Sequence, residues 1–247
     1  MKTLIRQLEA EYSRKMEDHL RSLTSTVPYS YIVNNFAKYV RRQELTRFLF
    51  RYDLFKEILN VKGSIVECGV FAGSGLMTWA QLSAILEPVA FLRKVFGFDT
   101  FEGFPAVSYN DTIGQANPNI KQGDVRDDSY EDLKTCIKLF DMNRFLPHLS
   151  KVQLIKGDFL LTSENFMKEN PYIVIALLYL DFDLYEPTKK ALEIFLPRMP
   201  KGSVLAFDEI NNPNWPGETL ALLETMNIRE CAIRKYSYEP NMSYIVL

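Results

Sequence analysis

Acidic residues follow two apolar segments of this 247-residue chain, at the points where buried strands would end. Asp181 comes directly after residues 173–180, and Asp208 and Glu209 come directly after residues 203–207. The carboxyl ends of parallel strands form the edge of an α/β sheet where ligands bind. Carboxylates from neighbouring strands repel one another there unless they share a proton or a hard cation. We therefore expect the three to hold a divalent cation, Mg²⁺ first, with Ca²⁺ or Mn²⁺ as alternatives.

A cation at this edge would bind a substrate hydroxyl, lower its pKa and orient it. Asp181 is the strongest candidate for a metal ligand or a base, because it follows eight apolar residues directly. The alternative is that acidic residues here serve the next helix. Asp183 fits that alternative, because it lies just before Pro187 at a predicted helix start, so we expect it to be a helix cap.

A glycine-rich segment indicates a nucleoside-bearing cofactor. Residues 67–75 read Glu-Cys-Gly-Val-Phe-Ala-Gly-Ser-Gly and join a predicted strand to a predicted helix. Glycine permits a tight turn and close approach of a ligand to the backbone. The spacing is not that of the GxGxxG dinucleotide motif. It fits the looser turn of S-adenosylmethionine (SAM) enzymes, in which an acidic residue opens the motif; a purely structural role for the glycines is the alternative.

Two more acidic residues follow the second and third predicted strands. Asp99 is expected to accept hydrogen bonds from ribose hydroxyls, unless it only forms a turn. Asp158, after Gly157, is expected to accept from an adenine amino group while Phe159 packs on the ring; a simple Gly-Asp turn is the alternative. Together with Glu67, these residues place carboxylates at three successive strand ends, which supports nucleoside binding more than any one of them.

Strand and helix patterns alternate from residue 63 onward, as in a parallel sheet with crossover helices. The expected strands are residues 64–68, 95–99, 152–156, 173–180 and 203–207. The expected helices are residues 74–86, 129–140, 162–168, 187–196 and 217–226. We predict an α/β, doubly wound sheet of order 3-2-1-4-5, closed by antiparallel strands within residues 228–236 and 243–247. In that order, Asp181 and the pair Asp208-Glu209 emerge side by side.

Residues 1–60 show a separate helical pattern, with apolar residues at every fourth position: Leu4, Leu8, Tyr12 and Met16. We expect this region to cap the active site or to contact another copy in a homo-oligomer, and residues 61–247 to form the catalytic domain. The long polar segment 108–124 is expected to be a lid or a binding loop.

Composition excludes several classes of protein. The apolar share of 47%, the charged share of 24% and a net charge of −2 are those of a soluble globular protein with no nucleic-acid or membrane partner. Three cysteines without a CxxC pair fit a cytoplasmic location. Two histidines argue against a zinc site or a histidine-centred triad.

Five short stretches, taken together, resemble the macrocin O-methyltransferase family: residues 65–73, 98–105, 180–188, 207–209 and 215–217. The resemblance covers about residues 40–225. It implies a Rossmann-like class I methyltransferase fold and a SAM-dependent, metal-dependent enzyme that methylates sugar hydroxyls.

The resemblance also implies roles for individual residues. The methionine part of SAM would contact Glu67, Gly69, Val70 and Phe71, with Gly73 and Ser74 completing the turn. The ribose and adenine would contact Asp99, Thr100, Phe101, Gly103, Gly157, Asp158 and Phe159. The cation would be held by Asp181, Asp208 and Glu209, with Asp181 also accepting the proton. Many family members carry Asp-Asp where this chain has Asp208-Glu209, so the longer Glu209 side chain either reaches the metal or misses it.

We therefore expect a SAM-dependent, metal-assisted O-methyltransferase that acts on a sugar hydroxyl of a nucleotide-sugar, glycoside or polysaccharide precursor. Methyl transfer from a sulfonium requires in-line attack by a deprotonated oxygen, so positioning and proton removal are most of the catalytic task. The alternatives are a catechol-type phenol O-methyltransferase and a non-catalytic nucleoside-binding scaffold. Candidates for contact with an anionic acceptor are Arg41, Arg42, Lys121 and Arg126.

Overall fold

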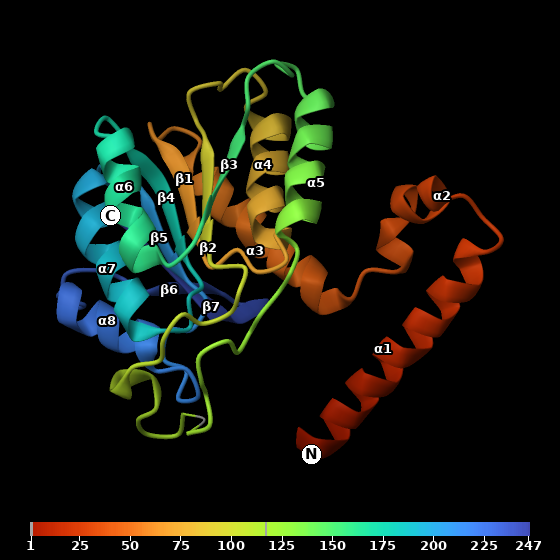
Figure 1. Ribbon diagram of the computed structural model, residues 1–247, viewed down its shortest axis with the longest axis horizontal. Helices are drawn as coiled ribbons and strands as arrows, with labels where there is room; N and C mark the ends of the chain where they lie inside the picture. The colour runs from red at the N-terminus through yellow and green to blue at the C-terminus, as the bar shows by residue number, and fades with distance from the viewer. Residues whose placement is uncertain (1, 117) are drawn as a thin grey trace. The chain divides into compact units, whose positions relative to one another are not determined.

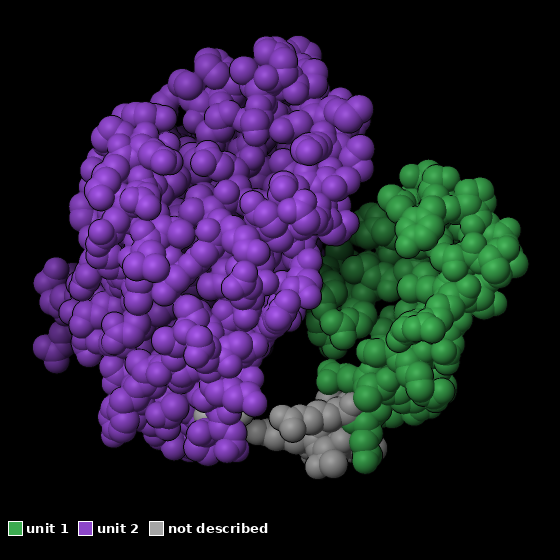
Figure 2. All heavy atoms as spheres, in the orientation of Figure 1, with its two compact units in different colours: residues 1–46 green, residues 47–247 purple. Residues whose placement is uncertain are grey.

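The computed structural model describes residues 2–116 and 118–247. The chain divides into two compact units, residues 1–46 and residues 47–247, which Figure 2 distinguishes by colour. The division falls earlier than the expected end of the helical region at residue 60. The reason is that apolar residues in the second half of helix α3 (Arg42–Ile58) belong to the core of the second unit: Phe50, Leu54, Phe55 and Ile58.

The first unit is helical and has no buried side chain among residues 7–46. It contains helix α1 (Lys2–Thr24), helix α2 (Tyr29–Asn34), the 3-10 turn η1 (Phe36–Lys38) and the start of α3. Several of its large apolar side chains are exposed: Leu8, Tyr12, Tyr29, Tyr31, Val33 and Phe36. None of the helices in the described part of the chain is both long and apolar enough to cross a membrane.

The second unit is built on a seven-stranded sheet of order β3-β2-β1-β4-β5-β7-β6. The strands are β1 (Ser64–Cys68), β2 (Val95–Asp99), β3 (Val152–Lys156), β4 (Ile175–Leu180), β5 (Val204–Phe207), β6 (Arg234–Tyr236) and β7 (Glu239–Val246). The first five are parallel, β7 is antiparallel to β5, and β6 is antiparallel to β7. The predicted fold class, strand order and closing antiparallel strands are therefore confirmed.

Helices cover both faces of this sheet (Figure 1). On one face lie α3, α4 (Ser74–Leu86) and α5 (Tyr130–Met142); on the other lie α6 (Phe159–Glu169), α7 (Tyr185–Phe195) and α8 (Gly217–Thr225). A short turn, η3 (Leu196–Arg198), follows α7. Because β4 is buried on both sides, it is apolar throughout and shows no polar alternation.

The register of the central strands determines where the acidic residues emerge. Leu180 pairs with Cys68 on one side and with Phe207 on the other, so the residues that follow all three strands lie at the same edge. Side chains alternate along a strand, and Tyr179 pairs with Ala206. Asp181 and Asp208, each two residues further on, therefore continue on the face of the sheet that carries Tyr179.

The loop between β2 and α5, residues 100–129, lies at the same edge and contains the 3-10 turn η2 (Tyr109–Asp111). Its two arms are joined where the Phe104 N–H donates to the Asp124 carbonyl (3.0 Å) and the Gly123 N–H donates to the Phe104 carbonyl (2.9 Å). Phe104 also packs with Ile120 and Leu184 in a small apolar cluster. The loop is thus tied to the start of α7.

Candidate functional site

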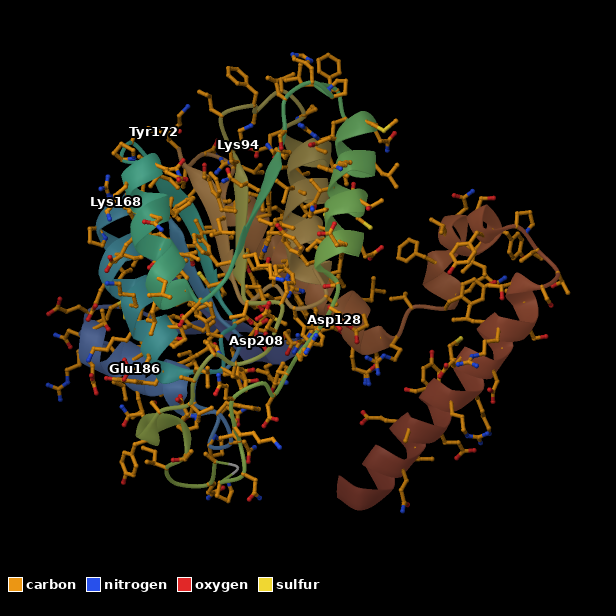
Figure 3. The ribbon with its side chains drawn as sticks, viewed as in Figure 1. Lys94, Asp128, Lys168, Tyr172, Glu186 and Asp208 are labelled. Atoms are coloured by element: carbon orange, nitrogen blue, oxygen red, sulfur yellow. The ribbon has the colours of Figure 1, made fainter. Side chains whose placement is uncertain are left out.

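A cavity of about 400 Å³ opens at the carboxyl edge of the parallel strands. Asp208 marks this edge in Figure 3, and Lys94, directly before β2, marks the opposite edge of the sheet. Six residues that line the cavity are acidic: Asp99, Asp158, Asp181, Asp183, Asp208 and Glu209. Arg47 is the one basic residue among the described lining residues. Such a cavity favours a cationic ligand.

The structure brings most of the predicted site residues together around this cavity. The lining includes Gly69, Phe71, Asp99, Thr100, Gly103, Gly157, Asp158, Phe159, Asp181, Asp208 and Glu209. The remaining predicted residues lie behind its wall or in the adjoining turn and helix: Glu67, Val70, Gly73, Ser74 and Phe101.

Asp99 organises the glycine turn. Its Oδ2 accepts hydrogen bonds from the backbone N–H groups of Val70 and Phe71, both at 2.8 Å, and its Oδ1 accepts from Phe101 at 2.6 Å. Phe71 and Phe101 have positive φ angles of 49° and 54°. The carboxylate therefore stabilises two turns of strained backbone, and because Asp99 also lines the cavity, its remaining lone pairs are candidate acceptors for a ribose.

Gly69 brings two strand ends into close contact. Its φ is +89°, and a Cβ atom at this position would lie 1.9 Å from the Asp181 carbonyl oxygen. Only glycine permits this approach. The glycine turn and the loop that carries Asp181 are therefore directly adjacent, as the predicted strand order requires.

Asp158 has two roles in the structure. It is the N-cap of α6, because its side chain accepts from the Leu160 N–H at 2.9 Å, and it also lines the cavity. Phe159 is 3% exposed and packs against Phe98 and Phe182. Helix α6 begins at Phe159, earlier than the predicted residue 162, because of this cap.

Glu67 is buried beneath the glycine turn, at 1% exposure. A Cβ atom on Gly75 would lie 2.4 Å from its Oε1 and 3.0 Å from Nη2 of Arg51, so both charged groups contact the start of α4. The Arg51 guanidinium lies 5.2 Å from the centroid of the Tyr179 ring. Burial raises the pKa of Glu67 from its ordinary value of 4.5 to about 7, although Arg51 acts to lower it.

Asp181 and Asp208 form the centre of the acidic site. Asp208 is 5% exposed; its Oδ1 accepts from the Tyr179 hydroxyl at 2.8 Å, and its Oδ2 lies 3.3 Å from Nη2 of Arg47. Burial and then the Asp208 charge raise the pKa of Asp181 well above its usual range. Because Asp208 has both oxygens occupied, Asp181 is the better placed of the two to accept a proton.

Glu209 also lines the cavity, and its carboxylate is engaged within its own turn. Its Oε2 accepts from the Asn212 side-chain amide. Burial and then the Glu209 charge raise the pKa of Asp183 to about 7. Within residues 2–116 and 118–247, no three His, Cys, Asp or Glu side chains are already arranged so that they could hold a metal ion.

The prediction that Asp183 caps the following helix is wrong. The N-cap of α7 is Leu184 and makes no side-chain capping bond. The Tyr185 N–H instead donates to Oδ1 of Asp111, from the 100–129 loop, at 2.6 Å. Asp183, with a φ of +62°, lines the cavity. Asp111, which is distant in the sequence, therefore accepts the hydrogen bond at the start of α7, and the local sequence does not reveal this.

Sequence reasoning also missed Arg47, Arg51 and Tyr179. The arginines lie one turn apart on α3, and both act on the acidic site. Their spacing of four residues was a visible signal, because it places both on one helix face. The sequence did not indicate which part of the protein that helix face would contact. Arg41 and Arg42, which were considered for an anionic acceptor, lie in the first unit.

Comparisons with known proteins agree with the geometry. Residues 52–216 match the family model described as Macrocin-O-methyltransferase (TylF). The crystal structure of CalS11, calicheamicin methyltransferase, is 35% identical with a TM-score of 0.87, covering 94% of this chain and 91% of that chain. The apo structure of CalS11, described as a TDP-rhamnose 3'-O-methyltransferase, is 33% identical with a TM-score of 0.80, covering 96% and 94%. No curated protein matches the chain.

The structure of the O-methyltransferase NovP is 21% identical with a TM-score of 0.65, covers 81% of this chain and 79% of that chain, and supports the fold alone. The fold and the matches define a SAM-dependent O-methyltransferase of class I. The chain belongs to the macrocin O-methyltransferase family, which confirms the resemblance inferred from its motifs, and within it is similar to the calicheamicin enzyme.

We predict that Glu67→Gln changes the pH dependence of stability. A group whose pKa rises from 4.5 to about 7 on folding stabilises the native state below pH 4.5, and this contribution is lost as pH rises through 7. Relative to Glu67→Gln, the free energy of unfolding of the wild type should fall by up to about 3 kcal/mol over that range. Urea denaturation at pH 4.5, 6 and 7.5 measures this difference. The control is Glu193→Gln, an exposed position on α7; parallel curves for wild type and Glu67→Gln would contradict the prediction.

Proposed function

We propose that this enzyme transfers the methyl group of SAM to a hydroxyl of a sugar, either nucleotide-linked or in a glycoside or polysaccharide precursor. The observation that carries the proposal is the acidic cavity beside the glycine turn, in a chain that is 33–35% identical over nearly its full length to a TDP-rhamnose 3'-O-methyltransferase. The three strand ends β1, β2 and β3 supply the cofactor half of the site, and β4 and β5 supply the acceptor half.

The cavity complements SAM in charge. Its acidic lining complements the sulfonium and ammonium charges, and the Asp99 carboxylate faces the position expected for a ribose. When bound, SAM supplies the methyl group and a neutral thioether leaving group. The residues proposed to contact it are Gly69, Phe71, Asp99, Thr100, Gly103, Gly157, Asp158 and Phe159, with Glu67, Val70, Gly73, Ser74 and Phe101 supporting them.

Asp181 is the proposed base. In the reaction the acceptor oxygen forms a bond to the methyl carbon, the carbon–sulfur bond breaks, and the hydroxyl proton passes to a carboxylate. The raised pKa of Asp181 suits this task, because a carboxylate with a raised pKa is a stronger base. The chain's own contribution is to hold the hydroxyl against Asp181 in line with the breaking bond.

We also propose a divalent cation, Mg²⁺ first, held by Asp181 and Asp208 with Glu209 as the third ligand. Hard carboxylate oxygens in a crowded, partly buried group fit such an ion. Burial and then the Asp208 charge raise the pKa of Asp181, which supports a cation shared between the two carboxylates. Two rearrangements would complete the site. Arg47 must release Asp208, and Glu209 must turn from Asn212.

The acceptor and the base are tested together by assaying release of S-adenosylhomocysteine with nucleotide-linked sugars, free glycosides and catechol. We expect turnover with a sugar, and a fall in kcat of about 10²–10⁴-fold in Asp181→Asn, because the amide accepts no proton. The affinity for S-adenosylhomocysteine, measured by calorimetry, should stay within a few-fold. The control Asp128→Asn, an exposed side chain paired with Arg126, should keep wild-type kcat. Turnover of catechol alone would overturn the sugar assignment.

The cation is tested by calorimetric titration of Mg²⁺ into protein saturated with S-adenosylhomocysteine. Asp208→Asn should lose Mg²⁺ binding. Arg47→Ala should bind Mg²⁺ more tightly than the wild type, because a competing positive charge is removed from Asp208. Absence of heat in the wild type, together with full activity in EDTA, would remove the metal from the mechanism.

We also propose that the protein forms a homo-oligomer and is located in the cytoplasm. The cytoplasm is supported by the three free cysteines, Cys68, Cys136 and Cys231. The oligomer is supported by the first unit, in which residues 7–46 bury no side chain. Helices are stabilised mainly by packing an apolar face, so a second copy of the chain is the proposed cover for the exposed residues of α1.

Light scattering after size exclusion should therefore give a mass that is a multiple of 28.7 kDa. Substituting both Leu8 and Tyr12 by Glu should shift the protein to a single chain, because charges replace the apolar contact. Leu161→Glu is the matched control, since Leu161 is also exposed but lies on α6 in the second unit. A wild-type mass of one chain would contradict the oligomer.

A further inference from the structure

Two buried carboxylates close to the cavity are not among its lining residues. Glu218 is 0% exposed and lies in the first turn of α8, and Asp111 is 2% exposed and lies in η2 of the 100–129 loop. A carboxylate is costly to bury unless hydrogen bonds compensate it. Both residues accept from backbone N–H groups in the segments that follow β4 and β5, and Asp111 also accepts from the backbone and hydroxyl of Ser108.

Glu218 joins two loops. Its Oε1 accepts from the Asp183 N–H at 3.3 Å, and its Oε2 accepts from the Glu209 N–H at 3.1 Å. Both donors lie beyond the ends of β4 and β5, where the sheet no longer supplies partners. A single carboxylate therefore bridges the loop after Asp181 to the turn after Asp208.

The next residue of α8 reinforces this connection. The Thr219 hydroxyl accepts from the Asn211 N–H at 2.8 Å and donates to the Glu209 carbonyl at 3.4 Å. Asn211 and Asp183 have φ angles of 63° and 62°, in the left-handed region that non-glycine residues rarely adopt. Such backbone persists only where surrounding contacts determine it. The hydrogen bonds that Glu218 and Thr219 of α8 make to these two residues are such contacts.

Asp111 joins a third segment. Its Oδ1 accepts from the Tyr185 N–H at 2.6 Å, and its Oδ2 accepts from the backbone N–H and the hydroxyl of Ser108, both at 2.7 Å. A Cβ atom on Gly217 would lie 2.5 Å from the Tyr185 nitrogen and 2.7 Å from Oδ1 of Asp111. The 100–129 loop, the start of α7 and the start of α8 therefore meet at one point.

We propose that Glu218 and Asp111 are positioning residues for methyl transfer: Glu218 holds the Asp181 and Asp208 loops at a constant separation, and Asp111 fastens the 100–129 loop to them. This inference rests on the proposed role of the acidic cavity in catalysis. Each residue must accept through both oxygens at once, which a carboxylate does and an amide does not. Their hydrogen-bond partners named above, Asp183, Glu209, Tyr185 and Ser108, are not among the residues proposed to contact SAM.

The test compares Glu218→Gln and Asp111→Asn with control variants that make the same carboxylate-to-amide change at other positions. The controls are Glu193→Gln, exposed on α7, and Asp127→Asn, whose side chain accepts from the Ser129 N–H in the same loop. We expect kcat to fall about 10²-fold in both test variants, because a displacement of about 1 Å in a catalytic group costs that much. KM for SAM and the affinity for S-adenosylhomocysteine should stay within about three-fold. The controls should keep wild-type kcat.

A second measurement does not depend on activity. Hydrogen exchange of the Asp183 and Glu209 amides should be faster in Glu218→Gln, and exchange of the Tyr185 amide faster in Asp111→Asn, while the Val70 and Phe71 amides held by Asp99 stay protected. This measurement separates failure of the inference from failure of the proposed function: unchanged exchange at the named amides refutes the inference whichever acceptor is methylated. Wild-type kcat in folded variants, or a loss of cofactor affinity equal to the loss of kcat, would also overturn it.

Discussion

Repulsion between carboxylates at one edge of the sheet is the constraint on which the rest of the site depends. Asp181 and Asp208 emerge from adjacent strands into a cavity whose described lining contains one basic residue, Arg47, and burial strengthens their repulsion. Positively charged side chains from outside the sheet partly compensate this repulsion. Helix α3 supplies Arg47 to Asp208 and places Arg51 near Glu67 and Tyr179, and the Tyr179 hydroxyl donates to Asp208. The residual negative charge suits the sulfonium of SAM and is the basis for the proposed divalent cation.

The same residue type performs a second, structural task around the cavity. Asp99, Asp111 and Glu218 each accept backbone N–H groups from loops that follow strand ends. Buried N–H groups need partners, and such loops lie beyond the hydrogen-bond ladder of the sheet. Acidic residues at this edge therefore divide into those directed into the cavity and those that hold the loops in place. Asp99 does both, because it lines the cavity and also accepts from the N–H groups of the glycine turn.

Much of the site could be predicted, because it follows from position along strands. The apolar runs before Asp99, Asp181 and Asp208 indicated strand ends, and the parallel order placed those ends at one edge. The orientation of side chains beyond the strands could not be predicted in this way. Asp183 lines the cavity from a backbone with a φ of 62°, which departs from the alternation that holds within a strand. Glu209 accepts from Asn212 in the turn beyond β5, where that alternation no longer applies.

The sequence alone determined the α/β class, the strand order, the glycine turn and the presence of three acidic strand ends, since each depends on local periodicity and on the handedness of crossover connections. Only the tertiary structure decided which residues, distant in the sequence, contact these carboxylates and the loops beside them. Arg47 and Asp208 are 161 residues apart, and Asp111 and Tyr185 are 74 apart. Contacts at such separations arise from packing of helices and loops against the completed sheet, and no pattern within a short window of sequence encodes them.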